Sequence, residues 1–366
     1  MLPRARFPAP CNFRPVLSYG SPIEGRFSAP LARYAAPQCL APRGSMKAIV
    51  QEGYGSPDVL HLREIATPIV ADDSVLVRVR AASVNAADCH LLRLPLPARL
   101  ILGLRSPKAP VRGFDLSGHV EAVGGNVTRF KPGDEVFGRA PGTFAEFASA
   151  REDRLAPKPR RLTFGQAAAV PVAGSTALLG LRDHGHVLRG QHVLICGAGG
   201  GVGTFAVQIA KALGAYVTAV TCTRNVDLIR SIGPDEVIDY TQEDFTQRGR
   251  RYDVFFDIAA NRSLGDCRRV LAPNGTFVGA GAAKGDSIAV LTRLLALLAL
   301  SRFASQRIVS FMAKVCYEDL VVLTELIESE KVSPVIDREY SLSEVPDAMR
   351  YVAGGHARAK VVINVS

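Results

Sequence analysis

The hydrophobic pattern divides the chain into two kinds of segment. Between Met46 and Phe164, short runs in which apolar and polar residues alternate predict β-strands, as in residues 74–84 (SVLVRVRAASV), because successive side chains of a strand face opposite sides. Turn-forming residues such as 131–134 (KPGD) separate these runs. We therefore predict a β-rich module here.

Beyond Phe164 the pattern becomes helical over residues 164–181, where Pro171 interrupts it. Apolar strand-like runs then alternate with helical runs, an order typical of a parallel sheet with helices on both faces. Residues 340–365 return to a helix and a closing strand, so we expect this tail to rejoin the first module. The predicted strands are 192–197 (HVLICG), 216–221 (YVTAVT), 236–240 (EVIDY), 252–259 (YDVFFDIA) and 275–282 (GTFVGAGA).

Together these patterns predict an α/β protein of two folded domains, the number that a length of 366 residues favours. The β-rich domain is predicted over residues 46–167 and 311–366. An inserted domain with a doubly wound parallel sheet is predicted over residues 168–310.

Composition narrows the class of protein. The chain has 48% apolar and 21% charged residues, as expected of a globular protein that buries a core. The net charge is +10, but no block of basic residues mixed with aromatic ones is present, which argues against a nucleic-acid partner. The seven cysteines form no C-x-x-C pair, so they indicate neither a zinc lobe nor a redox dithiol and suit a reducing compartment.

The first 45 residues differ from the rest, with six arginines, one acid, eight prolines and no apolar periodicity. We predict that they are disordered. Two interpretations stay open: an organellar transit peptide, or a translated stretch upstream of a start at Met46. No apolar run of the kind found in secretory signals is present. We expect a cytoplasmic protein, or an organellar one if this leader is a transit peptide.

A glycine-rich segment, GAGGGVG, follows the strand at 192–197 and precedes a helical run with one apolar face. In the G-x-G-x-x-G frame of dinucleotide-binding folds, its three positions are Ala198, Gly200 and Gly203. Gly200 lets the backbone approach a pyrophosphate, and Gly203 lets the helix pack on the strand. The phosphates then rest on free N–H groups at the helix start. The cofactor loop is completed by Gly201 and Val202.

The residues at the end of the next predicted strand indicate whether the cofactor is NADPH or NADH. They read TCTRN over residues 221–225, with no acid before Asp227. NAD-binding folds place an acid here, whereas NADP-binding ones offer small polar and basic groups. We predict that Thr223 and Arg224 hold a 2′-phosphate, which a guanidinium binds through two hydrogen bonds, and that NADPH is the cofactor. The alternative for Arg224 is a solvated residue at a helix start.

Four segments carry a resemblance to a known family: 113–138 (GFDLSGHVEAVGGNVTRFKPGDEVFG), 197–215, 235–240 (DEVIDY) and 355–363 (GHARAKVVI). Over residues 46–366 the chain resembles the medium-chain dehydrogenase/reductase superfamily, in its zinc-independent quinone oxidoreductase branch. The resemblance implies a GroES-like β-rich catalytic domain with an inserted Rossmann domain and an active site between them. Because relatives are usually dimers, we expect a homodimer.

The resemblance also assigns further residues to the cofactor. Thr176 matches a threonine at a helix start near the nicotinamide carboxamide, and Tyr240 matches a tyrosine beside the adenosine phosphate; an aromatic side chain at an interface is the alternative for Tyr240. Lys360 follows the tail motif, although Ala359 stands where the family usually has glycine. Small residues next to the nicotinamide are Gly279, Ala280 and Gly281.

No metal site is predicted. The segment VNAADCH places Cys89 beside His90, but adjacent side chains point in different directions and rarely share one ion. Zinc-dependent relatives hold their metal with two cysteines and a histidine, and those positions here are Asn85, Phe114 and Val172, which cannot replace thiolate and imidazole.

Without a Lewis acid nothing lowers the pKa of an alcohol, so reduction is favoured. The resemblance implies an NADPH-dependent reductase of a quinone or an α,β-unsaturated carbonyl compound, with a small hydrophobic electrophile as substrate. Asn85 would donate a hydrogen bond to the substrate oxygen. His90, where relatives often have tyrosine, would relay a proton, or else it is a satisfied or solvent-facing imidazole.

Other readings stay open. The protein could be a zinc-free enoyl or acyl reductase, or a non-catalytic NADPH-binding partner protein. The apolar segment 90–110, with interspersed arginines, is predicted to be a lid over the substrate pocket. Ordinary packing against the rest of the protein is a less favoured role for this segment, and contact with a membrane is the least favoured.

Overall fold

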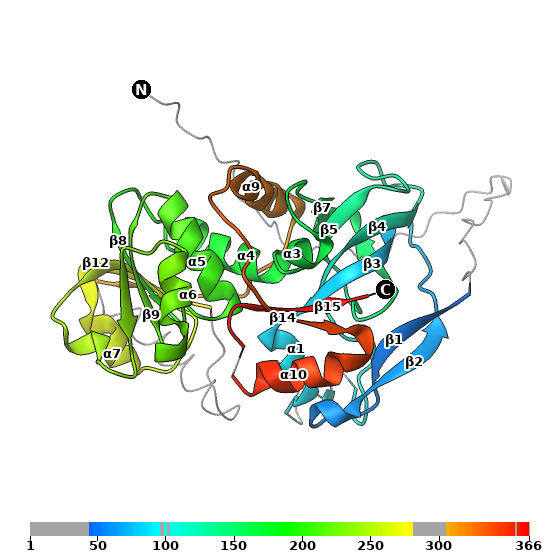
Figure 1. Ribbon diagram of the computed structural model, residues 1–366, viewed down its shortest axis with the longest axis horizontal. Coiled ribbons are helices and arrows are strands. Elements are labelled where there is room, and N and C mark those ends of the chain that lie inside the picture. The colour runs from blue at the N-terminus through cyan, green and yellow to red at the C-terminus, as the bar shows by residue number, and fades with distance from the viewer. Residues whose placement is uncertain (1–43, 96–98, 101–102, 281–304, 356, 366) are drawn as a thin grey trace, which may run out of the picture.

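The computed structural model describes residues 44–95, 99–100, 103–280, 305–355 and 357–365. The predicted disordered leader, apart from its last two residues, and Gly281 lie outside this range. In Figure 1 the chain forms two parts side by side, one built on a parallel sheet and one on a mainly antiparallel sheet, with helix α4 (Pro171–Leu179) between them. The α/β class is confirmed.

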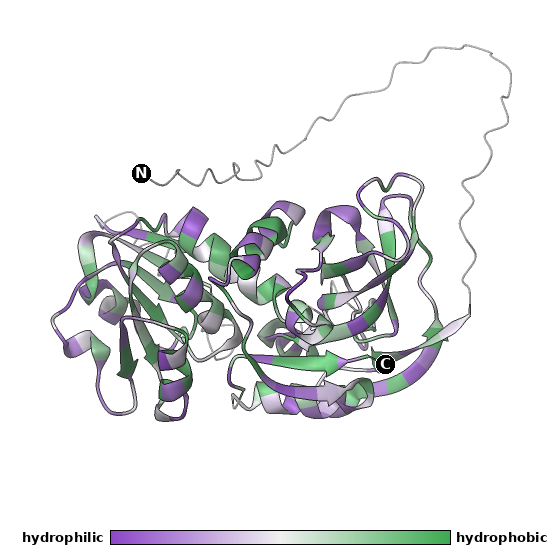
Figure 2. Ribbon diagram, turned by 45° about the horizontal axis from the view of Figure 1, so that its top comes forward, coloured by the Kyte–Doolittle hydropathy of each residue, from purple (hydrophilic) through white to green (hydrophobic). Residues whose placement is uncertain are grey.

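The parallel sheet has six strands in the described part of the chain, in the order β10–β9–β8–β11–β12–β13. This order confirms the parallel sheet that the alternating pattern predicts. Its strands are nearly continuous apolar runs because both faces are covered, and they are coloured as hydrophobic in Figure 2. The strands are β8 (His192–Cys196), β9 (Tyr216–Thr221), β10 (Glu236–Asp239), β11 (Tyr252–Asp257), β12 (Leu271–Gly279) and β13 (Arg307–Ser310).

The second sheet follows the order β14–β15–β3–β4–β5–β7 among the described residues, and β6 pairs with β3. The tail strand β15 runs antiparallel to β3, with Val361 opposite Val84, so the tail lies in the same sheet as the first strands. A separate hairpin joins β1 (Ser45–Gln51) to β2 (Leu60–Ala66). The sheet strands are β3 (Ser74–Val84), β4 (Asp115–Val123), β5 (Glu135–Arg139), β6 (Phe147–Arg151), β7 (Leu155–Pro157), β14 (Ile336–Ser341) and β15 (Lys360–Asn364).

Helices flank both sheets. The short segment η3 (Gly180–His184) continues α4 with π-type hydrogen bonds, a form that is common near functional sites. The remaining α-helices among the described residues are α1 (Ala86–Leu92), α3 (Phe164–Ala168), α5 (Gly201–Ala212), α6 (Val226–Ser231), α7 (Leu264–Arg269), α9 (Tyr317–Glu328) and α10 (Val345–Ala353). Single turns of 3-10 helix lie at Pro57–Val59, Glu152–Arg154, Thr223–Asn225, Phe245–Gln247 and Leu342–Glu344.

Helix α4 joins the two parts. Its side chains are buried almost all round, as expected of a helix that is covered on every side. Gly174 lets α9 approach closely, since a Cβ there would lie 3.2 Å from Leu323. One hydrophobic core runs from Phe137 on β5 through α4 to Ile195 on β8. The two parts therefore share a core, and α4 fixes their relative position.

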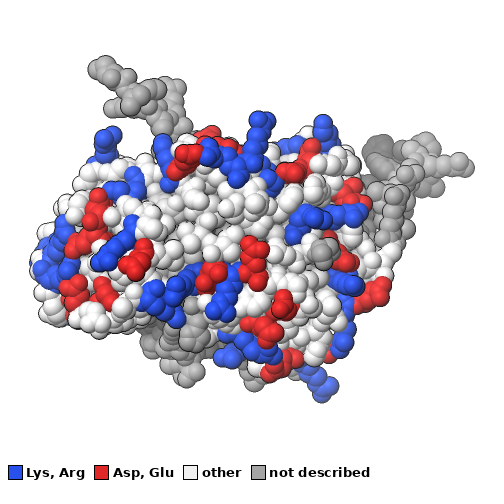
Figure 3. All heavy atoms as spheres, viewed as in Figure 1, with Lys and Arg blue, Asp and Glu red and all other residues white. Residues whose placement is uncertain are grey.

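On the face shown in Figure 3, lysines and arginines alternate with aspartates and glutamates, so this face carries no broad field of one sign. Among the described residues, no helix is both long and apolar enough to cross a bilayer.

Candidate functional site

The glycine-rich loop has the form that a dinucleotide pyrophosphate needs. It connects β8 to α5, whose N-cap is Gly200 and has no side-chain cap, so the first N–H groups of the helix are left for an anion. A Cβ on Gly200 would have one described atom within 4 Å, the carbonyl oxygen of Gly197 at 3.5 Å, so this side of the loop is open. A Cβ on Gly203 would collide with the backbone of Gly197 and Ala198. The described residues therefore fit the phosphates of NADPH.

The predicted 2′-phosphate residues lie at the carboxyl end of β9. Arg224 is exposed, and its Nη2 donates to the carbonyl oxygen of Gly355 at 2.6 Å. The hydroxyl of Thr223 donates to the carboxylate of Asp239 at 2.6 Å, and this bond is the largest cause that holds the pKa of Asp239 below its ordinary value. Tyr240 is 44% exposed at the same edge. Sequence reasoning missed Asp239, which belongs to the neighbouring strand.

Thr176 is buried and bonded within its own helix. Its Oγ1 donates to the carbonyl oxygen of Val172 at 2.6 Å, so its lone pairs can still accept an N–H such as that of a carboxamide. The prediction that Thr176 stands at a helix start is wrong, because α4 begins at Pro171, a residue suited to the first helical turn. Val172 N–H donates in turn to Oδ1 of Asp115 at 3.0 Å.

Asn85 lies at the other side of Asp115. Its Nδ2 donates to Oδ2 of Asp115 at 2.9 Å, and its Oδ1 accepts from Nζ of Lys360 at 2.8 Å. Ser83 donates to the same Asp115 oxygen at 2.8 Å. Asp115 is fully buried and Lys360 is 2% exposed, so burial lowers the pKa of the Lys360 ammonium while the Asp115 carboxylate opposes that shift. A continuous chain of hydrogen bonds thus links Thr176 to Asn85 and Lys360.

A second carboxyl group, that of Asp88, contacts the backbone of Asn85. The backbone N–H of Asn85 donates to Oδ2 of Asp88 at 2.8 Å, whereas Oδ1 of Asp88 has no hydrogen-bond partner. Burial raises the pKa of Asp88 to about 7, and the nearby Asp115 carboxylate adds to the shift. Arg112, whose Nε donates to Gln51, lies close enough to oppose it.

The tail strand also contacts the glycine-rich loop. The N–H of Ala359 donates to the carbonyl oxygen of Gly199 at 2.9 Å, and Ala359 forms an isolated bridge with Gly200. Ala359 has a φ of 59°, the left-handed region where glycine is favoured, which is the backbone form that the usual family glycine would adopt. A Cβ on Gly201 would lie 2.9 Å from Cδ of Lys360. The loop and Asn85 therefore both touch Lys360.

Three other residues predicted to belong to the site, His90, Gly279 and Ala280, lie in α1 and at the end of β12. His90 is exposed on the last turn of α1, and Cys89 faces α10, with Sγ 3.7 Å from the carbonyl oxygen of Met349. Gly279 ends β12, and the N–H of Ala280 donates to the carbonyl oxygen of Asp257 at 3.1 Å. These two small residues thus lie at the carboxyl edge of the parallel sheet, as the loop does.

The three positions that hold zinc in metal-dependent relatives meet around one carboxylate. Asn85 and Val172 both bond to Asp115, and Phe114 precedes it under the guanidinium of Arg139. None of the three side chains is a zinc donor. Within the described ranges, no three His, Cys, Asp or Glu side chains are grouped to hold a metal ion.

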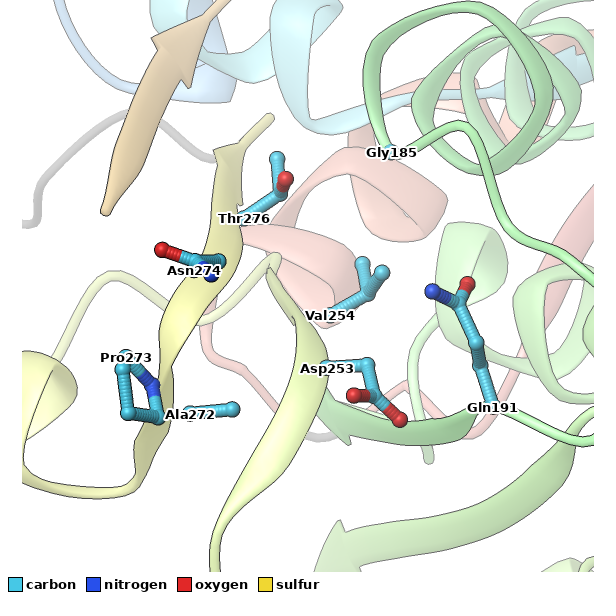
Figure 4. A pocket seen from close by; sticks show the side chains of 8 residues that line it. All are labelled: Gly185, Gln191, Asp253, Val254, Ala272, Pro273, Asn274 and Thr276. Carbon is cyan, nitrogen blue, oxygen red and sulfur yellow. The ribbon is translucent and has the colours of Figure 1, made fainter. Parts of the chain in front are cut away.

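A hollow of about 370 Å³ lies elsewhere, at the amino ends of β11 and β12. Figure 4 shows Asp253, Gln191 and Asn274 among its lining side chains. Ligands of open parallel sheets bind beyond the carboxyl ends of the strands. This hollow is therefore separate from the cofactor loop, which follows the carboxyl end of β8.

Comparisons with known proteins agree with this geometry. The family model of the alcohol dehydrogenase GroES-like domain matches residues 71–160, and that of zinc-binding dehydrogenases matches residues 232–363. The mitochondrial NAD(P)H oxidoreductase RTN4IP1 of Mus musculus is 34% identical, over 87% of this chain and 89% of that protein. The 2-methylene-furan-3-one reductase of Solanum lycopersicum is 32% identical, over 96% of this chain and 87% of that protein.

Solved structures give the same result. The quinone oxidoreductase from Coxiella burnetii has a TM-score of 0.78 and 30% sequence identity to this chain, and the match covers 88% of this chain and all of that one. The predicted combination of a GroES-like domain with a Rossmann-like domain is therefore confirmed, whereas the individual domain boundaries stay a prediction.

Proposed function

Because the chain belongs to the zinc-independent quinone oxidoreductase-like branch of the medium-chain dehydrogenase/reductase superfamily, we propose that it is an NADPH-dependent reductase that transfers hydride to a quinone or an α,β-unsaturated carbonyl compound. The relatives named above include an enone reductase and a quinone oxidoreductase. Both substrate classes present a conjugated carbonyl oxygen, which collects negative charge as hydride arrives at the far end of the conjugated system.

One observation carries the proposal: the hydrogen-bonded chain from Thr176 through Val172 and Asp115 to Asn85. This chain connects the residue assigned to the nicotinamide with the residue assigned to the substrate. Lys360 extends this network to the glycine-rich loop. Such a fixed arrangement favours reaction because orientation is established before the substrate binds.

The chemistry then divides between cofactor and protein. When bound, NADPH supplies the hydride, which is two electrons and one proton. The second Nδ2 proton of Asn85 has no acceptor among the described residues, so it can donate to the substrate oxygen and stabilise its developing charge. A proton from solvent, or from His90, completes the reduction. Asn85 itself neither gains nor loses a proton.

The cofactor preference rests on the edge formed by Thr223, Arg224 and Tyr240. A guanidinium and an exposed aromatic ring suit a 2′-phosphate and its adenosine, and Asp239 already accepts hydrogen bonds from Thr223 and from Thr241. Its carboxylate is thereby directed toward hydroxyl groups of the protein. NADPH is favoured over NADH on these grounds.

The test is NADPH consumption against a panel of quinones and enones, with simple alcohols plus NADP⁺ as the contrasting set. We expect turnover of at least one conjugated carbonyl compound and none of the alcohols. N85A should lower kcat by roughly 10²-fold, the usual effect of losing one donor to a developing oxyanion. Tight NADPH binding with no oxidation by any electrophile would instead identify a non-catalytic NADPH-binding protein, and selectivity for acyl thioesters would identify an enoyl reductase.

Assembly and compartment are further parts of the proposal. We propose a homodimer, as the family resemblance implies; light scattering after gel filtration checks it. We also propose a cytoplasmic location, or an organellar one if residues 1–45 are a transit peptide. Fluorescent fusions with and without those residues distinguish the two.

A further inference from the structure

We propose that Lys360 positions the amide of Asn85 for the substrate and is not a ligand of the cofactor phosphates. The inference rests on the proposed function, because it assigns the Asn85 N–H to the substrate oxygen. It replaces the role that the family resemblance implies for Lys360. In this view Asp115 and Lys360 act as a pair, one on each side of the Asn85 amide.

The side-chain amide of Asn85 has one possible orientation. Lys360 carries only donors, so Oδ1 of Asn85 must face its Nζ at 2.8 Å. An ionised Asp115 carries only acceptors, so Nδ2 of Asn85 must face its Oδ2 at 2.9 Å. A flipped amide would place oxygen against carboxylate and N–H against ammonium. The N–H that remains is therefore held as a donor.

The Lys360 ammonium is held by the acceptors around Asn85. Its Nζ lies 2.8 Å from Asn85 Oδ1, 3.4 Å from Asp115 Oδ2 and 3.5 Å from the carbonyl oxygen of Val84. With the side chain 2% exposed, a phosphate on the glycine-rich loop would have to draw the ammonium away from a buried carboxylate. Leaving such a carboxylate without its cation is strongly unfavourable.

The side chain of Lys360 also connects this pair to the cofactor loop. The aliphatic stem of Lys360 passes beside Gly201, where an added Cβ would lie 2.9 Å from its Cδ. The backbone of the preceding residue, Ala359, is hydrogen-bonded to Gly199. The loop thus supports the side of the lysine stem, while the charged end reaches Asn85. The stem of Lys360 therefore contacts the cofactor loop, whereas its ammonium group contacts the residues that position the substrate.

The decisive variant is K360M, which keeps the length of the side chain and removes its charge. We expect kcat to fall at least tenfold while the Kd for NADPH, measured by isothermal titration calorimetry, stays within threefold of wild type. The matched control is K158M, since Lys158 is 7% exposed and bonds to the carbonyl oxygen of Leu162 and to Glu135, away from this network; it should leave kcat unchanged. A tenfold weaker NADPH affinity with kcat retained would overturn the proposal.

A second variant separates positioning from charge balance. K360M leaves the Asp115 carboxylate buried without a cation, so the double variant D115N/K360M should recover most of any lost thermal stability. Because both groups that orient the amide are then changed, kcat of the double variant should stay low. Full recovery of kcat would show that neutralising Asp115 is its whole role and would refute the proposal.

A spectroscopic readout is independent of turnover. The chain has seven asparagines, so selective ¹⁵N-Asn labelling gives few side-chain amide signals, and N85A identifies the Asn85 pair by its loss. We expect that pair to shift and broaden in K360M but not in K158M; an unchanged pair would contradict the positioning role. If the wild-type protein reduces no electrophile, the proposed function fails, and this measurement still decides whether Lys360 holds the amide.

Discussion

Replacing Arg224 by alanine tests the cofactor preference most directly. The side chain is exposed at the carboxyl edge of the parallel sheet, and its Nη2 donates to the carbonyl oxygen of Gly355 at 2.6 Å. That bond keeps the guanidinium at the edge that Thr223 and Tyr240 also form. A 2′-phosphate bound there would gain charge-assisted hydrogen bonds that the ribose hydroxyl of NADH does not offer.

The expected loss follows from how exposed the site is. Two unit charges 4 Å apart interact by about 1 kcal/mol in water and about 4 kcal/mol at an effective dielectric constant of 20. Because Arg224 is exposed, the lower half of that range applies, and we expect R224A to weaken NADPH binding by about 1–2.5 kcal/mol, or roughly 5- to 60-fold. Screening should reduce the effect as salt is raised.

The assay is the Kd of NADPH and of NADH, each measured for wild type and variant. NADH binding should change by less than about threefold, since it brings no 2′-phosphate. R230A is the matched control, because Arg230 is an exposed arginine on the following helix that pairs with Asp227; it should leave both affinities unchanged. Equal losses of NADPH and NADH affinity in R224A would remove Arg224 from the phosphate site.

Three further predictions use the same structure. D239N should tighten NADPH binding a few-fold without affecting NADH, because it removes a carboxylate from the phosphate edge; weaker NADPH binding would contradict this. G180A would place a Cβ 2.5 Å from the ring of Phe256, so urea titration should show a free energy of unfolding lower by about 1–3 kcal/mol. The control is G53A, at a glycine with open space around it, which should change the free energy of unfolding by less than about 0.5 kcal/mol. The pKa of Asp88 is raised from 3.8 to about 7, so between these pH values the carboxyl group is protonated in the folded protein and ionised in the unfolded chain. The free energy of unfolding should therefore fall as pH rises through this range, by about 4 kcal/mol at most. D88N should flatten that slope, and an identical slope in both proteins would argue against the shift.

Much of the fold can be predicted from the sequence, because the hydrophobic periodicity of a strand or helix depends only on neighbouring residues. The alternation over residues 74–84 predicts a strand with the same bounds as β3, and the glycine-rich segment stands between a strand and a helix as predicted. Thr176 was misplaced within its helix because Pro171 reads as an interruption of a long helical run. In the structure it is the first residue of α4, since proline is tolerated at that position.

The network around Asn85 could not be predicted in the same way, because it depends on strand register. Val361 lies opposite Val84 and Ser83 opposite Asp115, and these two pairings bring Lys360 and Asp115 to Asn85. Periodicity says that a strand exists and not which strand it pairs with. Asp239 escaped notice for the same reason, since it lies beside Thr221 through the parallel pairing of β10 with β9.

The pairing of β15 with β3 has a consequence for protein synthesis. The strand that completes the sheet around Asn85 leaves the ribosome after all six strands that the structure describes in the parallel sheet. Domains tend to fold as they emerge, from the amino terminus onward. The inserted domain can therefore fold on the nascent chain before Lys360 emerges to reach Asn85, and a chain truncated before β15 is expected to lack reductase activity.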